Sequence, residues 1–236
     1  MRHAANFGFA MVGMMTCFGT MSRATNANVI FTNTQVNEGG TGFGNRLTVL
    51  SVQQKGNNTT EFGSVLWDGN ADDLTDDATS QSLTQTVAAM LAEGINENTL
   101  TVIFNINEGG DSTPVLTLFD FALIFQNEDG VELFRETYDA PEAGLGLDLA
   151  GSGNGASGWK FDVAFTNAAA AASFFSVATN RLGMEIVSEQ AIADTKGGAE
   201  SFFVISPVIV PEPSGALLSL VGLGAALRYR GRRIKV

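Results

Sequence analysis

The stretch FDFALIFQNEDGVELFRETY, residues 119–138, decides the expected fold of this chain. Two apolar runs flank the polar segment Gln126–Gly130, and its Asp129-Gly130 pair is expected to supply the positive-φ residues that a tight reversal needs. The stretch therefore predicts a β-hairpin.

With the two runs of this hairpin, the chain has nine short runs that are rich in Val, Ile, Leu, Phe and Thr and bounded by turn residues. They lie at 29–34, 46–53, 62–67, 100–106, 115–126, 131–138, 159–165, 182–187 and 201–205. Many short strands separated by turns are typical of two packed antiparallel sheets. The sequence predicts a mainly β domain, a jelly-roll-like antiparallel β-sandwich of about nine strands.

Two further segments are expected to be short helices. The first starts with a Ser-x-x-Gln capping box at Ser82–Gln85 and ends before Gly94, with apolar residues at helical spacing between them. In the second, Asn167 caps the alanine run Ala168–Ala172, because alanine loses almost no side-chain entropy in a helix. The residues Phe174, Phe175 and Val177 follow and are expected to cover the sheet.

The charge distribution separates the ends of the chain from its middle. Residues 28–206 contain 24 Asp and Glu against 6 Lys and Arg, a net charge of −18, whereas the whole chain has a net charge of −12. A charge of this sign repels nucleic acid and attracts cations. Nucleic-acid binding is therefore not expected.

Cysteine and histidine are confined to the N-terminal end, as Cys17 and His3. If that end is removed on export, the mature protein has no disulfide, no thiolate nucleophile, no His/Cys zinc site and no Ser-His-Asp triad. The remaining catalytic options are a carboxylate pair, a Ser-Lys pair or a metal held by oxygen ligands.

The first 27 residues are typical of a secretory signal peptide. A short basic start precedes an uncharged apolar run over residues 7–21, and small residues stand at Thr25 and Ala27. Cleavage is expected after Ala27, with Ala24 as the alternative, following export by the Sec machinery. A membrane anchor is less well supported, because the run is shorter than the roughly 20 residues of a span.

Residues 207–236 contain three features that follow one another along the sequence. Pro211, Glu212 and Pro213 come first, and the prolines prevent a helix from running back into the domain. Residues 214–227 are uncharged and mostly apolar, which predicts a transmembrane helix that Ser214 caps. The tail 228–236 then predicts a cytoplasmic C-terminus, because it holds five basic residues. They are Arg228, Arg230, Arg232, Arg233 and Lys235.

This arrangement of a Pro-Glu-Pro motif, an apolar helix and a basic cluster resembles the PEP-CTERM sorting signal of Gram-negative bacteria. The resemblance implies recognition by an exosortase, a membrane cysteine transpeptidase-like enzyme, and cleavage near Pro211–Pro213. It implies a precursor anchored in the inner membrane, a mature protein at the cell surface or in the extracellular matrix, and a producer of exopolysaccharide or biofilm. The alternative is a buried C-terminal helix with a solvated basic end.

The segment DGNADD, residues 68–73, is the densest acidic cluster. It begins like an EF-hand calcium loop, but Asp73 stands where that loop needs glycine and Thr79 replaces its bidentate glutamate. A calcium site of different construction, on Asp68, Asn70, Asp72 and Asp73, remains a hypothesis beside that of a solvated acidic loop. No other cofactor is expected.

Two tryptophans and a few charged residues are the other candidates for a site. Trp67 and Trp159 are the residues with which a sugar ring would stack, although a tryptophan in a sandwich more often packs in the core. Arg181 is expected to be a structural partner of one of the many acids. The carboxylates that could act as acid and nucleophile are Glu132, Glu136 and Asp139.

Three hypotheses of function follow. The first is a non-enzymatic, exported structural or adhesive protein of the cell surface, associated with exopolysaccharide. The second is a carbohydrate- or calcium-binding surface module. The third is a carboxylate-based glycan hydrolase.

Overall fold

The computed structural model describes residues 28–36, 46–56, 58–107, 116–148, 158–186, 188, 192–195 and 198–206. In these residues the chain is mainly β-strand with two short helices, and neighbouring strands are antiparallel. The predicted mainly β, antiparallel class is thus confirmed. Each of the nine predicted runs contains a strand, but the described residues form 15 strands, because the run 115–126 contains two strands and five further short strands lie between the predicted runs.

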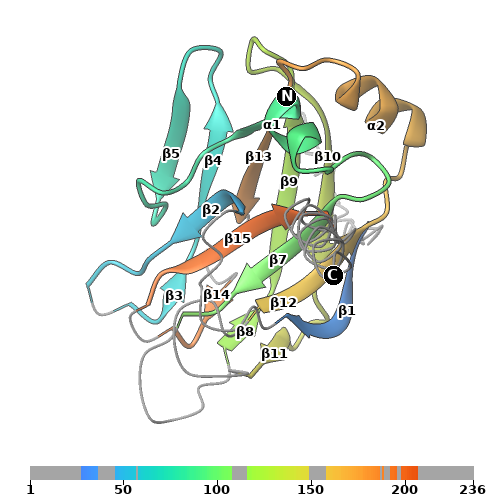
Figure 1. Ribbon diagram of the computed structural model, residues 1–236. Helices are drawn as coiled ribbons and strands as arrows, with labels where there is room; N and C mark the ends of the chain where they lie inside the picture. The colour runs from blue at the N-terminus through green and yellow to red at the C-terminus, as the bar shows by residue number, and fades with distance from the viewer. Residues whose placement is uncertain are drawn as a thin grey trace, which may run out of the picture.

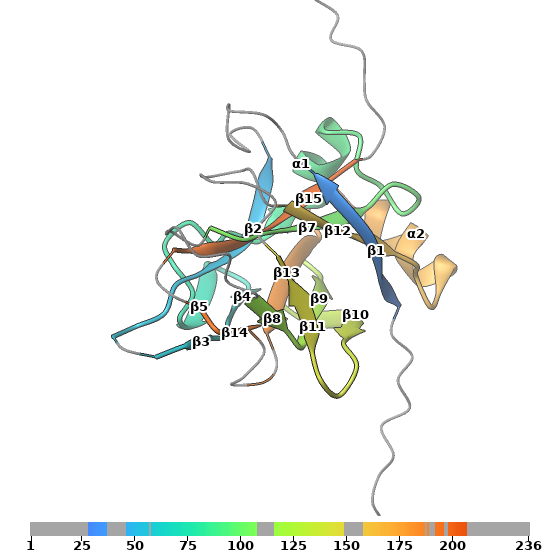
Figure 2. The same ribbon diagram turned by 90° about the horizontal axis from the view of Figure 1, so that it is seen from below.

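The first layer is a five-stranded sheet whose middle strand is buried on both faces. Across this sheet the strands are β1 (Val29–Val36), β12 (Gly158–Val163), β7 (Thr101–Asn105), β15 (Glu200–Ile205) and β2 (Leu47–Val52). Figure 2 shows this sheet above the second layer, so that the two layers form a sandwich-like arrangement.

The second layer contains the hairpin that the sequence predicted. Across this sheet the strands are β10 (Glu132–Asp139), β9 (Asp120–Gln126), β13 (Arg181–Ile186), β4 (Gly63–Trp67) and β5 (Asp72–Asp76), with β6 (Gln85–Thr86) also paired to β13. Asn127 N donates to Val131 O (3.0 Å), and only Gly130 of the turn has positive φ (+82°). The predicted reversal is therefore confirmed, whereas the expected positive φ at Asp129 is wrong.

A four-stranded sheet continues the second layer at its lower end in Figure 1. Its strands are β11 (Leu145–Leu147), β8 (Leu116–Leu118), β14 (Ile192–Ala193) and β3 (Thr60–Glu61). Each of them is next along the chain to one strand of β10, β9, β13 and β4, and the order across the sheet is the same. Single residues, Phe62 and Phe119, separate β3 from β4 and β8 from β9, so these strands are long ones broken at a bend.

Aromatic rings fill the space between the layers. Phe121 of the second layer lies 5.1 Å from Phe202 and 5.3 Å from Phe161 of the first, measured between ring centroids, and Phe202 stacks on Phe104 at 4.5 Å. All four side chains are fully buried. Burial of this much apolar surface is the main stabilising contribution to the domain.

Helix α1 (Val87–Ala92) begins later than the sequence predicts. Its cap is Thr86, which accepts a hydrogen bond from Ala89 N (3.1 Å), so the predicted Ser82–Gln85 capping box is wrong. The Ser82 hydroxyl instead donates to Ser51 O (3.0 Å), and the Gln85 amide donates to Thr48 O (2.6 Å). Tertiary hydrogen bonds to β2 have taken the place of the local ones.

Helix α2 (Ala168–Phe175) follows the prediction at its start. Asn167 Oδ1 accepts from the backbone N of Ala169 and Ala170, both at 3.1 Å. Phe174 and Phe175 are buried as expected, whereas Val177 is 45% exposed and does not cover the sheet.

Neither helix of the described residues has the length and apolarity that a membrane crossing needs. The predicted signal peptide 1–27 and transmembrane helix 214–227 lie outside the described residues.

Candidate functional site at the Trp67 corner

Two hairpin turns meet at the upper end of the second layer in Figure 1. Residues 68–71 connect β4 to β5, and residues 127–130 connect β9 to β10. A Cβ on Gly69 would come within 2.8 Å of Asp129 O, and a Cβ on Gly130 within 2.5 Å of Trp67 O. The turns therefore pack backbone against backbone, at a distance that only glycine allows.

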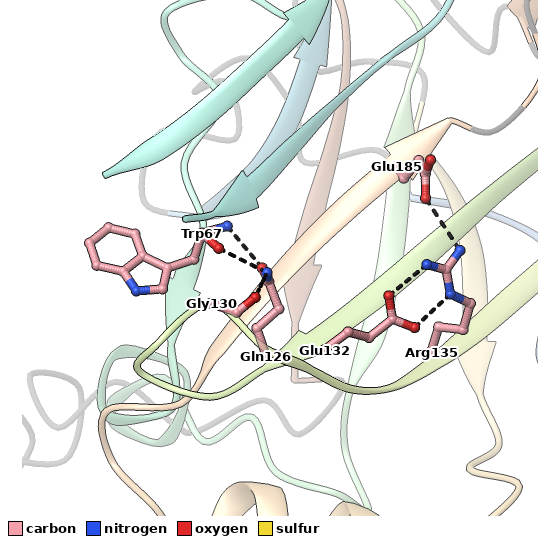
Figure 3. Close-up of polar contacts among 6 residues, drawn as sticks. All are labelled: Trp67, Gln126, Gly130, Glu132, Arg135 and Glu185. Carbon is pink, nitrogen blue, oxygen red and sulfur yellow. Dashed lines mark hydrogen bonds and ion pairs between the residues drawn. The ribbon is translucent and has the colours of Figure 1, made fainter. Parts of the chain in front are cut away.

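The side chain of Gln126 joins these two turns (Figure 3). Its Oε1 accepts from Trp67 N (2.9 Å), and its Nε2 donates to Trp67 O (2.9 Å) and Gly130 O (3.0 Å). The Gln126 amide thus forms the two hydrogen bonds with the backbone of Trp67 that a residue of a paired strand would otherwise form. A Cβ on Gly183 would come within 2.5 Å of Val65 O and 3.3 Å of Gln126 Oε1, so β4 and the amide pack closely against a glycine of β13.

The Trp67 indole is half-buried and extends away from Gln126 in Figure 3. Its Nε1 donates to Glu128 O (2.7 Å), which fixes the orientation of the ring. The guanidinium carbon of Arg181 lies 3.6 Å from the ring centroid, in cation–π contact with the indole. Residues from β4, β13 and the 127–130 turn therefore hold this ring.

A short chain of hydrogen bonds connects Arg181 to Asp72 through Thr84. Arg181 Nη1 donates to Thr84 Oγ1 (3.0 Å), and the Thr84 hydroxyl donates to Asp72 Oδ1 (2.5 Å). Arg181 thus contacts an acid through a hydroxyl, and within the described part of the chain no carboxylate forms an ion pair with it. Arg181 was expected to pair with an acid, and it reaches Asp72 only through the hydroxyl of Thr84. We refer to Trp67, Asp72, Thr84, Gln126 and Arg181, with the two turns, as the Trp67 corner.

Asp68 and Asn70, two of the four calcium candidates, lie in the 68–71 turn. Asp68 Oδ1 accepts from Asn70 N (2.7 Å) and Ala71 N (2.6 Å). These bonds, that from Ala71 first, lower the pKa of Asp68 below its usual range because they favour the ionised form. One oxygen of Asp68 is therefore committed to holding its own turn.

The other two candidates, Asp72 and Asp73, are consecutive residues of β5. Consecutive side chains of a strand point to opposite faces, so these two carboxylates do not converge. Asp72 Oδ1 is bound to Thr84, and no cluster of three or more His, Cys, Asp or Glu side chains suited to a metal occurs among the described residues. Calcium binding stays a prediction that only a titration can test.

Trp159, the second tryptophan, lies in the core. It is 8% exposed, its ring centroid is 5.7 Å from that of Phe31, and its Nε1 donates to Asp148 O (3.2 Å). The side chain connects β12 to β1 and to the segment after β11. Of the two tryptophans, only Trp67 presents a partly exposed ring.

The three candidate catalytic carboxylates lie along β10 and contact different partners. Glu132 binds Arg135 (2.6 Å), which also pairs with Glu185 (3.3 Å; Figure 3). The hydrogen bond from Arg135 lowers the pKa of Glu132. The buried Glu136 accepts from the backbone N (3.0 Å) and hydroxyl (2.8 Å) of Thr166.

Asp139, the third of these carboxylates, stands directly opposite Asp120 in the β9–β10 ladder. Asp120 Oδ1 accepts from Ser188 N (3.3 Å). Neither Glu132 nor Glu136 stands at this ladder position. The structure therefore does not bring the three candidates to one point on the sheet.

Other predicted sites fall outside the described residues. These are the signal cleavage site Ala27, the motif Pro211–Pro213 and the basic tail 228–236. Sequence reasoning also missed Gln126 and Thr84. The only signal for Gln126 was its place as a polar residue at the end of an apolar strand, directly before the turn.

The comparisons with known proteins yield no relative of this chain. No protein-family model matches it, and no match is found among curated proteins or solved structures.

Proposed function

We propose that this chain is an exported protein that is held briefly in the inner membrane by its C-terminal segment and then released to the cell surface or extracellular matrix. The observation that carries this proposal is the order of features in residues 211–236: two prolines around Glu212, an uncharged apolar run, and five basic residues in the last nine. The N-terminal apolar run, with small residues at Thr25 and Ala27, supports export.

The fold is proposed to be a jelly roll. The strand orders β2-β15-β7-β12 and β4-β13-β9-β10 support this topology, with β1 and β5 added at the edges. In this arrangement consecutive stretches of chain alternate between the two layers, as in paired Greek keys. Lectin domains are among the proteins with this architecture, but the architecture alone does not assign a function.

The mature domain is proposed to be a structural or adhesive component of an exopolysaccharide matrix rather than an enzyme. Its acidic charge supports a soluble, cation-attracting surface protein. The engagement of Glu132 by Arg135 and of Glu136 by Thr166 supports structural roles for these carboxylates. A matrix protein needs a stable fold and surface contacts rather than a reactive group.

The test is to determine both termini of the protein released by the cells that produce it. Mass spectrometry is expected to find an N-terminus at Asn28 or Thr25 and a C-terminus close to Pro211–Pro213. A variant with all five basic residues of 228–236 changed to Gln is expected to retain its C-terminal segment or to reach the surface in much smaller amount. Replacement of Lys55 and Lys160 by Gln is the matched control, because these two lysines belong to the acidic domain.

Full-length protein in the soluble cell interior, with both ends intact, would overturn the proposal. So would normal release and processing of the variant that lacks the basic residues.

A further inference from the structure

The Trp67 corner has the features of a binding site without a structural role that accounts for all of them. Trp67 is a large, partly exposed aromatic side chain on a rigid part of the sheet, where Gln126 and two glycines hold the backbone. A binding residue in a fixed orientation loses little conformational freedom when a ligand arrives. The corner is therefore built before any ligand binds.

The ring itself offers an apolar surface in a fixed orientation. Its N–H is bound to Glu128 O at 2.7 Å, and the guanidinium of Arg181 lies over one face at 3.6 Å. The partly exposed indole is therefore a flat apolar group beside the charged guanidinium of Arg181. The C–H face of a pyranose ring matches such a surface, because it is apolar while its hydroxyl groups point outward.

Hydrogen-bond donors and acceptors are present on other residues of the Trp67 corner. Arg181 carries five N–H groups, and its one hydrogen bond among the described residues goes to Thr84. Acceptors are present on Asp68 and Asp72, each of which has one oxygen beyond the Oδ1 atom used within the corner. Hydroxyl groups of a sugar both donate and accept, so they suit this mixture.

Charge decides between neutral and acidic sugars. Residues 28–206 have a net charge of −18, and the two turns of the corner contribute Asp68, Glu128 and Asp129. This field disfavours an anionic chain, and the single positive charge of Arg181 is already stacked on the indole. A neutral ligand avoids this repulsion.

We propose that the Trp67 corner binds a pyranose unit of a neutral glycan, with the sugar ring on the exposed part of the Trp67 indole and its hydroxyl groups on Arg181 and the neighbouring carboxylates. Identification of this glycan with a matrix polysaccharide rests on the proposed function. The stacking contact is independent of how the chain is exported.

The experiment uses the intrinsic fluorescence of the purified full chain, which has 2 tryptophans. In the variant Trp159→Phe the signal comes from Trp67 alone. The probes are maltohexaose, cellohexaose and laminarihexaose, with oligogalacturonate as the anionic comparison. At least one neutral probe is expected to shift the emission in a saturable way at up to millimolar concentration, equally in EDTA and in millimolar calcium.

Three substitutions show where the probe binds. Trp67→Ala, measured by calorimetry, is expected to weaken binding by at least about tenfold, as for loss of an aromatic anchor. Arg181→Ala is expected to weaken it by roughly three- to tenfold. The matched control Ile30→Ala, at an exposed apolar residue of β1 in the other layer, is expected to leave affinity unchanged.

The Trp67→Ala variant is expected to fold, because the hydrogen bonds from Gln126 go to the backbone of residue 67 and do not depend on its side chain. If Trp159→Phe does not fold, the indole N–H resonance of Trp67 in the unmodified chain replaces fluorescence, assigned with Trp67→Phe. Three results would overturn the inference: no binding of any neutral probe, binding that Trp67→Ala does not weaken, or preferential binding of oligogalacturonate. None of these results bears on the processing of the two termini.

Discussion

Trp159 and Trp67 lie in regions that use the same side chain in different ways. Trp159 belongs to β12, packs against the ring of Phe31 in the neighbouring strand β1, and is 8% exposed. Trp67 is the last residue of β4 and contacts Arg181 and Glu128. Around Trp159 stability comes from apolar burial, whereas around Trp67 it comes from backbone geometry and hydrogen bonds.

The difference shows that a corner can be rigid without being part of the hydrophobic core. Gln126 provides three hydrogen bonds there, and Gly130 allows a contact that any Cβ would prevent. The backbone is held while the indole stays partly exposed. Substitutions in the two regions should therefore differ in size and in kind.

The largest effect is expected for Trp159→Ala. Loss of this buried ring should reduce the free energy of unfolding by about 3–5 kcal/mol, because a cavity is left in the hydrophobic core beside Phe31. Trp67→Ala should cost only about 1–2 kcal/mol, since it removes a half-buried ring and a cation–π contact. Urea unfolding followed by circular dichroism measures both values. Equal losses would contradict the proposed difference between the regions.

The next largest effect is expected in the backbone of the Trp67 corner. Gly130→Ala should cost about 2–4 kcal/mol, because Gly130 has a φ of +82° and a Cβ would meet Trp67 O at 2.5 Å. Gly56→Ala is the control, since Gly56 has a similar φ of +77° but nothing within 4 Å of an added Cβ. That change should cost only about 1–2 kcal/mol. If thermal or urea unfolding gave the same loss for both, close packing of the turns would not be what holds the corner.

The smallest effect appears only at alkaline pH, in the aromatic core. Burial raises the pKa of Tyr138 to about 12, and its ring packs against Phe121 and Phe161. The unfolded chain loses this proton near pH 10, so it binds fewer protons than the folded chain between about pH 10 and 12, and stability falls as pH rises through this range. The loss should reach at most roughly 2.5 kcal/mol.

The variant Tyr138→Phe should lack this part of the alkaline loss while matching the unmodified chain at neutral pH. Unfolding free energies of both proteins at several pH values from neutral to strongly alkaline test this expectation. Parallel pH curves for the two proteins would show that Tyr138 does not titrate in the buried state.

Some of the fold could be predicted because the relevant signals are local. The 119–138 hairpin follows from two apolar runs and a glycine at the one position with positive φ. The second helix follows from an asparagine before five alanines. In both cases the deciding residues are within a few positions of each other.

Strand β5 was missed because its sequence, DDLTD, contains three aspartates, a residue that strands disfavour. It is a strand because β4 offers a free edge, and its exposed acids protect the new edge from further pairing. The first helix was placed too early because β2 takes the Ser82 hydroxyl and the Gln85 amide that a capping box would use.

The sequence by itself determined the mainly β class, the hairpin, the alanine helix and the acidic character of the domain, since periodicity, turn residues and charge are properties of short segments or of composition. Only the tertiary structure decided that Trp159 is a core residue and Trp67 a corner residue. Contacts of Trp67 with Gln126, Glu128 and Arg181 join positions between 59 and 114 residues apart in the chain. No local pattern encodes such contacts, because they depend on which strands the folded sheet places side by side.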